Sequence, residues 1–237
     1  MIGAIVSPAL RARVRGLALP VALAFGRLGF TPNALTVVGF GISLAAGVAA
    51  GFGAWIVAGV LVVFGGVFDL FDGALARATD RVSRLGAFLD SVFDRAGEAI
   101  VFLGIAAGTA ATSFDEVALL AAAAMAASFM VSYTRAKSES LGFTPGTKMA
   151  NVGVAPREVR LVILTIGLFL TGMFGGIVRP VTVFGAVDPW WAGRPALATS
   201  LGLIAVLATI TTIQRIVHVT RQAPPEEAAN PAGDQQP

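Results

Sequence analysis

The sequence has no cysteine and a single histidine, His218, among its 237 residues. A zinc, iron or copper site is therefore not expected, because such sites are usually built from sulfur and imidazole ligands. Charged residues are also scarce, at 13% of the chain, whereas 56% of the residues are hydrophobic and the mean hydropathy is +0.80. This composition is typical of a polytopic membrane protein with one membrane domain.

Long apolar runs recur along the chain and predict an all-α integral membrane protein with six transmembrane helices. Thr31-Pro32-Asn33 is a helix-start signal before the first run, and Gly51-Phe52-Gly53 ends it. A short polar connection, Ala78 to Arg84, separates the second run from the third. The expected spans are about 33–52, 54–77, 85–111, 117–135, 157–177 and 196–217.

The two ends of the chain are expected to lie outside this membrane domain, which we place at residues 30–220. Residues 1–29 interrupt an apolar sequence with several arginines, which argues against a signal peptide and predicts an N-terminal amphipathic helix lying in the membrane interface. A solvated basic tail is the alternative for this segment. The tail 221–237 is rich in proline, alanine and acidic residues and is predicted to be disordered.

Four aspartates lie where the second and third predicted spans approach each other. Asp69 and Asp72 fall in the last turns of one span, and Asp90 and Asp94 fall in the first turns of the next. Residues three or four apart share a helix face, so a hairpin would converge all four carboxylates at one membrane face. Glu98, one turn further in, is expected to be a hydrogen-bonding partner rather than a ligand.

Converging carboxylates in a site of low dielectric require cations, and oxygen ligands favour Mg²⁺, Mn²⁺ or Ca²⁺. Arg77, one turn beyond Gly73, offers a guanidinium fork suited to phosphate. Metal-assisted phosphate chemistry is the function that this arrangement indicates. Interhelical ion pairs near the membrane surface are the structural alternative, and a cation transporter or channel is the functional one. The clustering of the acids at one face disfavours a transport pathway.

The pattern Asp-x2-Asp-Gly-x2-Ala-Arg-x8-Gly-x3-Asp-x3-Asp, from Asp69 to Asp94, resembles the signature of the CDP-alcohol phosphatidyltransferases. Every specified position is present, and a weaker resemblance extends over residues 30–220. It implies phospholipid biosynthesis by metal-dependent transfer of a phosphatidyl group from CDP-diacylglycerol to an alcohol, with release of CMP. Members of this family usually form homodimers.

The resemblance also implies roles for individual residues. Asp69 and Asp72 would hold one Mg²⁺ ion, Asp90 would bridge two, and Asp94 would hold the second while acting as general base; Mn²⁺ is an alternative metal. The residues matching the positions that bind the nucleotide and diphosphate of the donor lipid are Gly73, Ala76, Arg77 and Ser83. Asn33 and Thr36 are also expected to contact the nucleotide, and capping of the helix that they begin is the alternative for these two.

Basic residues at three further helix ends could form a pocket for the phosphate of a phosphorylated polyol acceptor. They are Arg135, Lys137, Arg157, Arg160 and Arg215. Anchoring of basic side chains at the membrane surface is the alternative for each of them. The segments that contain them resemble parts of the phosphatidylinositol phosphate synthases, which implies inositol phosphate as the acceptor. Glycerol 3-phosphate is the alternative acceptor.

The distribution of Lys and Arg predicts the orientation of the chain. Apart from Arg179 and Arg194, all of them fall at the chain ends and on the side of the four aspartates. The positive-inside rule therefore places both termini and the active site on the cytoplasmic face of the plasma membrane. The same bias accounts for the sequence pI of about 10.2, so a nucleic-acid partner is not needed to explain it.

Overall fold

A computed structural model describes residues 8–110, 115–143, 149, 152–174, 182–183, 186–187 and 193–222. Within these residues the chain forms seven α-helices and one ladder of two short antiparallel strands. The helices are α1 Pro8–Arg27, α2 Pro32–Gly51, α3 Trp55–Ala78, α4 Arg84–Ala110, α5 Asp115–Ser140, α6 Arg157–Met173 and α7 Gly193–Thr220. The strands are β1 Thr182–Val183 and β2 Ala186–Val187.

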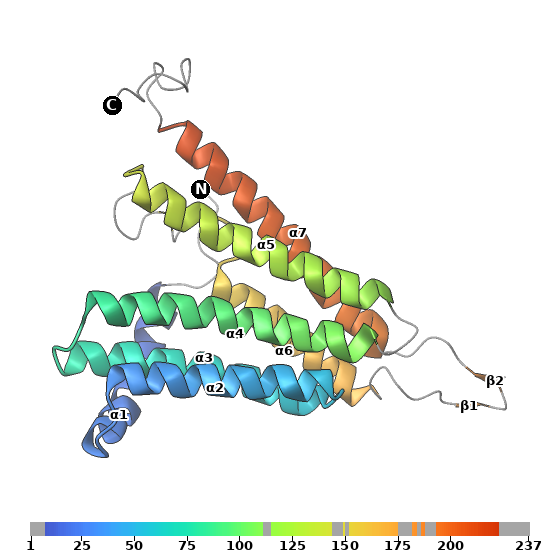
Figure 1. The fold of residues 1–237 in the computed structure, drawn as a ribbon, viewed down its shortest axis with the longest axis horizontal. Helices are drawn as coiled ribbons and strands as arrows, with labels where there is room; N and C mark the ends of the chain where they lie inside the picture. The colour runs from blue at the N-terminus through green and yellow to red at the C-terminus, as the bar shows by residue number, and fades with distance from the viewer. Residues whose placement is uncertain are drawn as a thin grey trace, which may run out of the picture.

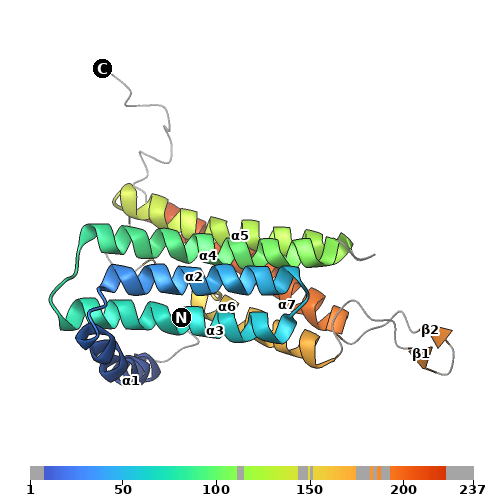
Figure 2. The ribbon, with the colours of Figure 1, turned by 60° about the horizontal axis from the view of Figure 1, so that its bottom comes forward.

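The helices form one elongated bundle (Figure 1). Helix α2 packs against both α3 and α4, α5 packs against α4 and α7, and α6 packs against α3 and α7. Helix α1 contacts α3 and lies across one end of the bundle, the end at which α3 leads into α4 (Figures 1 and 2). The end of α3 and the beginning of α4 lie at this end of the bundle, where α2, which packs against both helices, also begins.

Local caps fix where α2 and α4 begin. The Thr31 hydroxyl accepts a hydrogen bond from the backbone N–H of Ala34 at 3.2 Å, and Pro32 occupies the first turn of α2. The Ser83 hydroxyl accepts one from the N–H of Gly86 at 2.9 Å before α4. The predicted helix start at Thr31-Pro32-Asn33 is confirmed, and Ser83 performs the same role for α4.

Helix α5 continues beyond the expected end at residue 135 and stops at Ser140. Arg135 and Glu139 form an ion pair of 2.8 Å one turn apart, which supports this polar extension of the helix. The chain leaves the helix at Gly142, whose φ of 76° favours glycine. Arg135 and Lys137 therefore lie in the last turns of α5.

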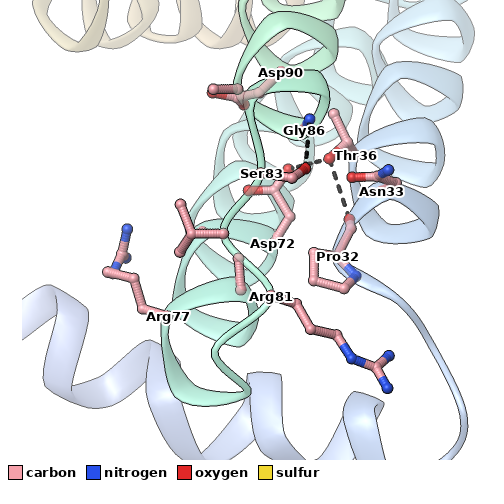
Figure 3. Close-up of a pocket in the computed structure, with 13 residues that line it drawn as sticks. Pro32, Asn33, Thr36, Asp72, Arg77, Arg81, Ser83, Gly86 and Asp90 are labelled. Atoms are coloured by element: carbon pink, nitrogen blue, oxygen red, sulfur yellow. Dashed lines mark hydrogen bonds between the residues drawn. The ribbon is translucent and has the colours of Figure 1, made fainter.

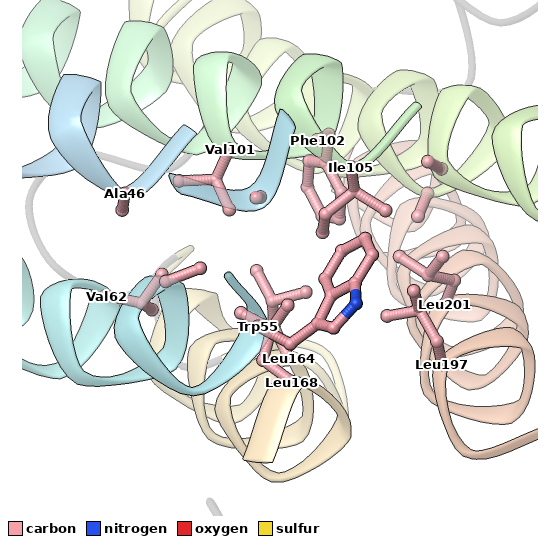
Figure 4. Close-up of a cluster of buried hydrophobic side chains, with 14 of the residues drawn as sticks. Ala46, Trp55, Val62, Val101, Phe102, Ile105, Leu164, Leu168, Leu197 and Leu201 are labelled. Atoms are coloured by element: carbon pink, nitrogen blue, oxygen red, sulfur yellow. The ribbon is translucent and has the colours of Figure 1, made fainter. Parts of the chain in front are cut away.

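The core of the bundle is apolar and contains residues from six helices. The Trp55 indole lies between Phe102 and Ile105 on one side and Leu197 and Leu201 on the other (Figure 4). Large apolar side chains are also exposed on the outside of the helices, which is expected where helices face lipid. Examples are Leu44, Val57, Leu103, Leu119, Val162, Ile166 and Val206.

Glycines allow α2 and α4 to approach closely. A Cβ atom at Gly104 would collide with the backbone of Gly47, and one at Gly108 would lie 2.5 Å from the carbonyl oxygen of Ala50. Small residues at such crossings permit backbone contact between membrane helices. The crossing fixes the second half of α4 against the second half of α2, and Gly86 approaches Asn33 where both helices begin.

Four described helices are long and apolar enough to cross a membrane, judged by length and composition: α2, α3, residues 116–140 of α5, and α7. The predicted class, an all-α membrane protein, is thus confirmed. Helix α4 carries four charged residues in its first half, and α6 has 17 residues. The predicted disordered tail lies outside the described residues except for its first two positions, and so does the end of the span expected at 157–177.

Candidate active site

Three carboxylates converge where α3 ends and α4 begins. One oxygen from each of Asp69, Asp72 and Asp90 lies within 4.8 Å of the other two. Asp69 and Asp72 share a face of α3, as their spacing predicts, and the turn between the helices brings Asp90 opposite them. Three hard oxygen ligands so close together fit a divalent cation such as Mg²⁺ or Mn²⁺, because without a cation their charges repel one another.

Asp94 lies outside this group of three and is linked to it by an arginine. Its Oδ1 is 2.7 Å from Nη1 of Arg157, and the same nitrogen pairs with Oδ2 of Asp69. Arg157, which begins α6, thus bridges Asp94 and Asp69. The short connection brings the polar ends of α3 and α4 to one end of the bundle, as expected, but the fourth carboxylate, Asp94, pairs with the guanidinium of Arg157.

The first cavity at this site has a volume of about 270 Å³ and lies between the beginnings of α2 and α4 and the end of α3 (Figure 3). Its lining contains Asp72 and Asp90 together with all six residues predicted to bind the donor lipid. These six are Asn33, Thr36, Gly73, Ala76, Arg77 and Ser83.

Hydrogen bonds and close contacts shape this first cavity. Thr36 donates to Oδ2 of Asp72 at 2.7 Å, and Figure 3 shows the two side chains pointing toward each other. A Cβ atom at Gly86 would lie 3.0 Å from Oγ of Ser83 and 3.2 Å from Oδ1 of Asn33. Gly86, a signature position, therefore keeps these two polar groups accessible, a role that the sequence alone did not assign to it. Arg81 also lines the cavity and was not predicted; only its basic character near the site could have indicated it.

A second cavity of about 660 Å³ lies on the other side of the carboxylates, between α3, α4, α5, α6 and α7. Its lining carries charges of both signs. Four of the five residues predicted for the acceptor phosphate line it: Arg135, Arg157, Arg160 and Arg215. Lys137 is exposed on α5 and is not among the described lining residues of this cavity. Ala87 and Asp90 line both cavities, so the two spaces meet at the carboxylate cluster.

Two of these arginines are buried and already engaged. Arg160 is 1% exposed and binds both oxygens of Glu98, through Nε and Nη2, at 2.9 Å each. Arg215 is 4% exposed; its Nε donates to the carbonyl oxygen of Val152 at 3.1 Å, and its Nη1 donates to that of Val131. Glu98 is a hydrogen-bonding partner, as expected. Arg135 is more accessible and pairs with Glu139.

Arg95 lines the second cavity and was not predicted as a site residue. Its Nη2 lies 3.4 Å from Oδ2 of Asp94, its Nη1 lies 3.8 Å from Glu98, and its Nη1 also donates to the Ser132 hydroxyl. A signal was available in the sequence, because an arginine beside an acid inside an apolar segment requires a partner.

Comparison with known proteins agrees with this geometry. The family model for CDP-alcohol phosphatidyltransferase matches residues 30–220. This chain belongs to the CDP-alcohol phosphatidyltransferase family, and it is a membrane-associated transferase of phospholipid biosynthesis.

Several relatives indicate the branch of the family that the chain resembles. It is 34% identical over 204 residues to phosphatidylinositol phosphate synthase of Cutibacterium acnes, covering 85% of this chain and 91% of the relative. It is 33% identical over 195 residues to archaetidylinositol phosphate synthase of Pyrococcus horikoshii, covering 82% of this chain and 86% of the relative.

Solved structures show the same relationship. Crystal structures of Mycobacterium tuberculosis phosphatidylinositol phosphate synthase match with a TM-score of 0.70 for the form with CDP-DAG bound and 0.71 for the form with manganese and citrate. Sequence identity is 29% and 28%, respectively. The first match covers 85% of this chain and 92% of the other, and the second covers 86% and 88%.

Proposed function

We propose that this enzyme transfers the phosphatidyl group of CDP-diacylglycerol to a hydroxyl of inositol phosphate and produces phosphatidylinositol phosphate and CMP. The observation that carries the proposal is the meeting of two cavities at Asp90. One cavity contains the residues that match donor positions, and the other is rich in arginine. The names of the relatives and the CDP-DAG bound to the Mycobacterium tuberculosis enzyme support the same reaction.

The first cavity would receive the cytidine and diphosphate of the donor. Asn33 and Ser83 supply an amide and a hydroxyl, and Gly86 leaves both accessible. Arg77 supplies a guanidinium for phosphate oxygens. Gly73 lies beside Arg77, and a Cβ atom there would come within 3.2 Å of Nη1, so glycine leaves this arginine free to adjust.

Asp69, Asp72 and Asp90 would hold a Mg²⁺ ion, with Mn²⁺ as an alternative, and Asp94 would complete a site for a second ion. Bound ions of this kind neutralise the negative charge of a diphosphate in the transition state. The convergence of three carboxylate oxygens supports the first ion. The second ion requires Arg157 to withdraw from Asp69 or Asp94, since it pairs with both.

The acceptor would enter the second cavity, where Arg135, Arg157 and Arg215 attract its phosphate. The acceptor oxygen forms a bond to the phosphorus of the phosphatidyl group, and the bond from that phosphorus to the diphosphate bridge breaks. CMP leaves with the bonding electrons, and Asp94 takes the hydroxyl proton as general base. Lys137 was also predicted to bind the acceptor, and that prediction rests on its sequence position alone.

We further propose that helices α2 to α7 all span the membrane and that α1 lies in the interface. Helices α4 and α6 expose Leu103, Val162 and Ile166 on their outer sides, as the four candidate spans expose similar residues. The active site and both termini would face the cytoplasm across the plasma membrane, because the basic residues gather on that side. A homodimer is expected from the family.

The test is CMP release from CDP-diacylglycerol by the purified protein with four acceptors in parallel: inositol phosphate, free inositol, glycerol 3-phosphate and serine. We expect release with inositol phosphate and a lipid product of the mass of phosphatidylinositol phosphate. Release with glycerol 3-phosphate alone would be consistent with the proposed donor site but would contradict inositol phosphate as the acceptor. Absence of release with all four would overturn the proposed reaction.

A further inference from the structure

Glu98 is a buried carboxylate behind the second cavity, and two arginines surround it. It is 6% exposed and accepts two hydrogen bonds from Arg160 on α6, each of 2.9 Å. Nη1 of Arg95, one turn earlier on α4, lies 3.8 Å from its Oε2. A buried charge is costly unless it is paired and hydrogen-bonded, so this placement of Glu98 requires both guanidiniums.

Arg95 connects Glu98 to Asp94. Its Nη2 lies 3.4 Å from Oδ2 of Asp94, and its Nη1 donates to the Ser132 hydroxyl on α5. The other oxygen of Asp94, Oδ1, faces Arg157 at 2.7 Å. Asp94 is therefore held between two guanidiniums, and one of them is itself held by Glu98 and Ser132.

Charges of opposite sign alternate along this connection, and its two ends differ in burial. The order is Glu98, Arg95, Asp94, Arg157 and Asp69. Glu98 and its partner Arg160 are almost completely buried, whereas the Asp69 side chain is 21% exposed at the cavity. The buried end is fixed by bidentate hydrogen bonds, so it can serve as the rigid support for the end that meets substrate.

We propose that Glu98 is a positioning residue for phosphatidyl transfer: it holds Arg95, and Arg95 sets the orientation of the Asp94 carboxylate. This inference rests on the proposed function and deepens it. It also separates the roles of the arginines in the second cavity. Arg160 donates from Nε and Nη2 to Glu98, and from Nη1 to the carbonyl oxygen of Ala155 at 3.1 Å. It therefore supports the wall of the second cavity. Arg135 and Arg157 are more accessible, and Arg215, whose Nε and Nη1 are engaged, can still offer Nη2 to the acceptor phosphate.

The principal test is Glu98→Gln, which keeps the shape of the side chain and removes its charge. We expect kcat to fall by about tenfold or more while the KM for CDP-diacylglycerol is retained, because loss of a group that orients a metal-binding or catalytic side chain typically has this effect. Glu98→Asp, which keeps the charge, should recover part of the lost kcat. A Glu98→Gln protein with the kcat of the wild type would overturn the inference.

Metal affinity, measured without turnover, distinguishes a positioning role of Glu98 from a general structural role. Mn²⁺ titration of the purified protein, without donor or acceptor, should show weaker binding in Glu98→Gln and in Asp94→Asn than in the wild type. Glu116→Gln is the matched control, because Glu116 pairs with Arg194 where α5 and α7 begin, away from the site. It should match the wild type in both kcat and Mn²⁺ affinity. Unchanged Mn²⁺ affinity in Glu98→Gln would contradict the proposed link to Asp94.

Ser132→Ala is a second variant that remains informative if Glu98→Gln does not fold. It removes the hydrogen bond from Arg95 to α5 without introducing a charge change. We expect a smaller fall in kcat, again with an unchanged donor KM; a wild-type kcat would count against the role of Arg95. Because each variant is compared with the wild type, an inactive wild type would instead reject the proposed function.

Discussion

The hydroxyl of Thr36 on α2 donates a hydrogen bond of 2.7 Å to Oδ2 of Asp72 on α3. Both residues are buried, with 7% and 5% of their surfaces exposed. The bond links α2, which begins at the first cavity, to the carboxylate cluster. In the proposed reaction, this bond couples the placement of the donor to the placement of a metal-binding group.

Replacing Thr36 with valine removes this bond and leaves a buried carboxylate oxygen without its donor. We expect donor binding to weaken by about 1 kcal/mol, which corresponds to a rise of roughly fivefold in the donor KM. Steady-state kinetics with varied CDP-diacylglycerol measures the change. Thr209→Val is the control, because the Thr209 hydroxyl is exposed and donates to the carbonyl oxygen of Ala205 on its own helix. Equal donor KM values in the two variants would contradict the role of Thr36.

Gly86→Ala should narrow the first cavity, which is proposed to bind the donor. The new Cβ atom would lie 3.0 Å from Ser83 Oγ and 3.2 Å from Asn33 Oδ1, so one of these groups must shift. Overpacking of this kind costs about 1–3 kcal/mol, and we expect the donor KM to rise roughly tenfold with little change in the acceptor KM. Gly41→Ala serves as the control, since a Cβ atom at Gly41 meets nothing within 4 Å. A larger effect on the acceptor KM than on the donor KM would place the donor elsewhere.

Arg157→Gln removes the guanidinium that lies between Asp69 and Asp94 and lines the second cavity. We expect the KM for inositol phosphate to rise by roughly tenfold, because a charge-assisted bond to phosphate is lost. The donor KM should change little. Arg84→Gln removes an exposed arginine that lines neither of the two described cavities, and it should leave the acceptor KM unchanged. An unaltered acceptor KM in Arg157→Gln would remove this residue from the acceptor site.

Gly104→Ala tests the crossing of α2 and α4 on which the site depends. Its methyl group would collide with the backbone of Gly47, which cannot move aside as a flexible side chain can. We expect a destabilisation of about 1–3 kcal/mol and a lower melting temperature of the purified protein in detergent. Gly202→Ala, where the nearest atom is Leu120 Cδ2 at 4.0 Å, is the matched substitution on α7. Similar melting temperatures for both variants would show that the crossing tolerates a side chain.

Much of the site could be predicted from the sequence, because its residues obey helical periodicity over a short distance. The spacing of Asp69 and Asp72 places them on one face of α3, and a short turn must bring Asp90 back toward them. Part of the lining of the first cavity was predictable for a similar reason, since Gly73, Ala76 and Arg77 continue the same helix. The structure brings these residues together as expected.

The second cavity was less predictable, because it depends on contacts between helices far apart in the sequence. Arg160 has the charge expected of a phosphate ligand, but its partner Glu98 lies on α4 and occupies its donors. The length of α5 was also underestimated, since its last turns are polar and lie beyond the apolar run. Hydropathy gives the extent of a lipid-facing segment and not the extent of the helix.

The most direct test of the proposed reaction is metal-dependent CMP release from CDP-diacylglycerol and inositol phosphate, measured for the wild type and for Asp90→Asn. Asp90 belongs to the carboxylate group and lines both cavities. We expect release that requires Mg²⁺ or Mn²⁺, stops on addition of a chelator, and is lost in a folded Asp90→Asn protein. Release that persists in the chelated enzyme or in Asp90→Asn would contradict it.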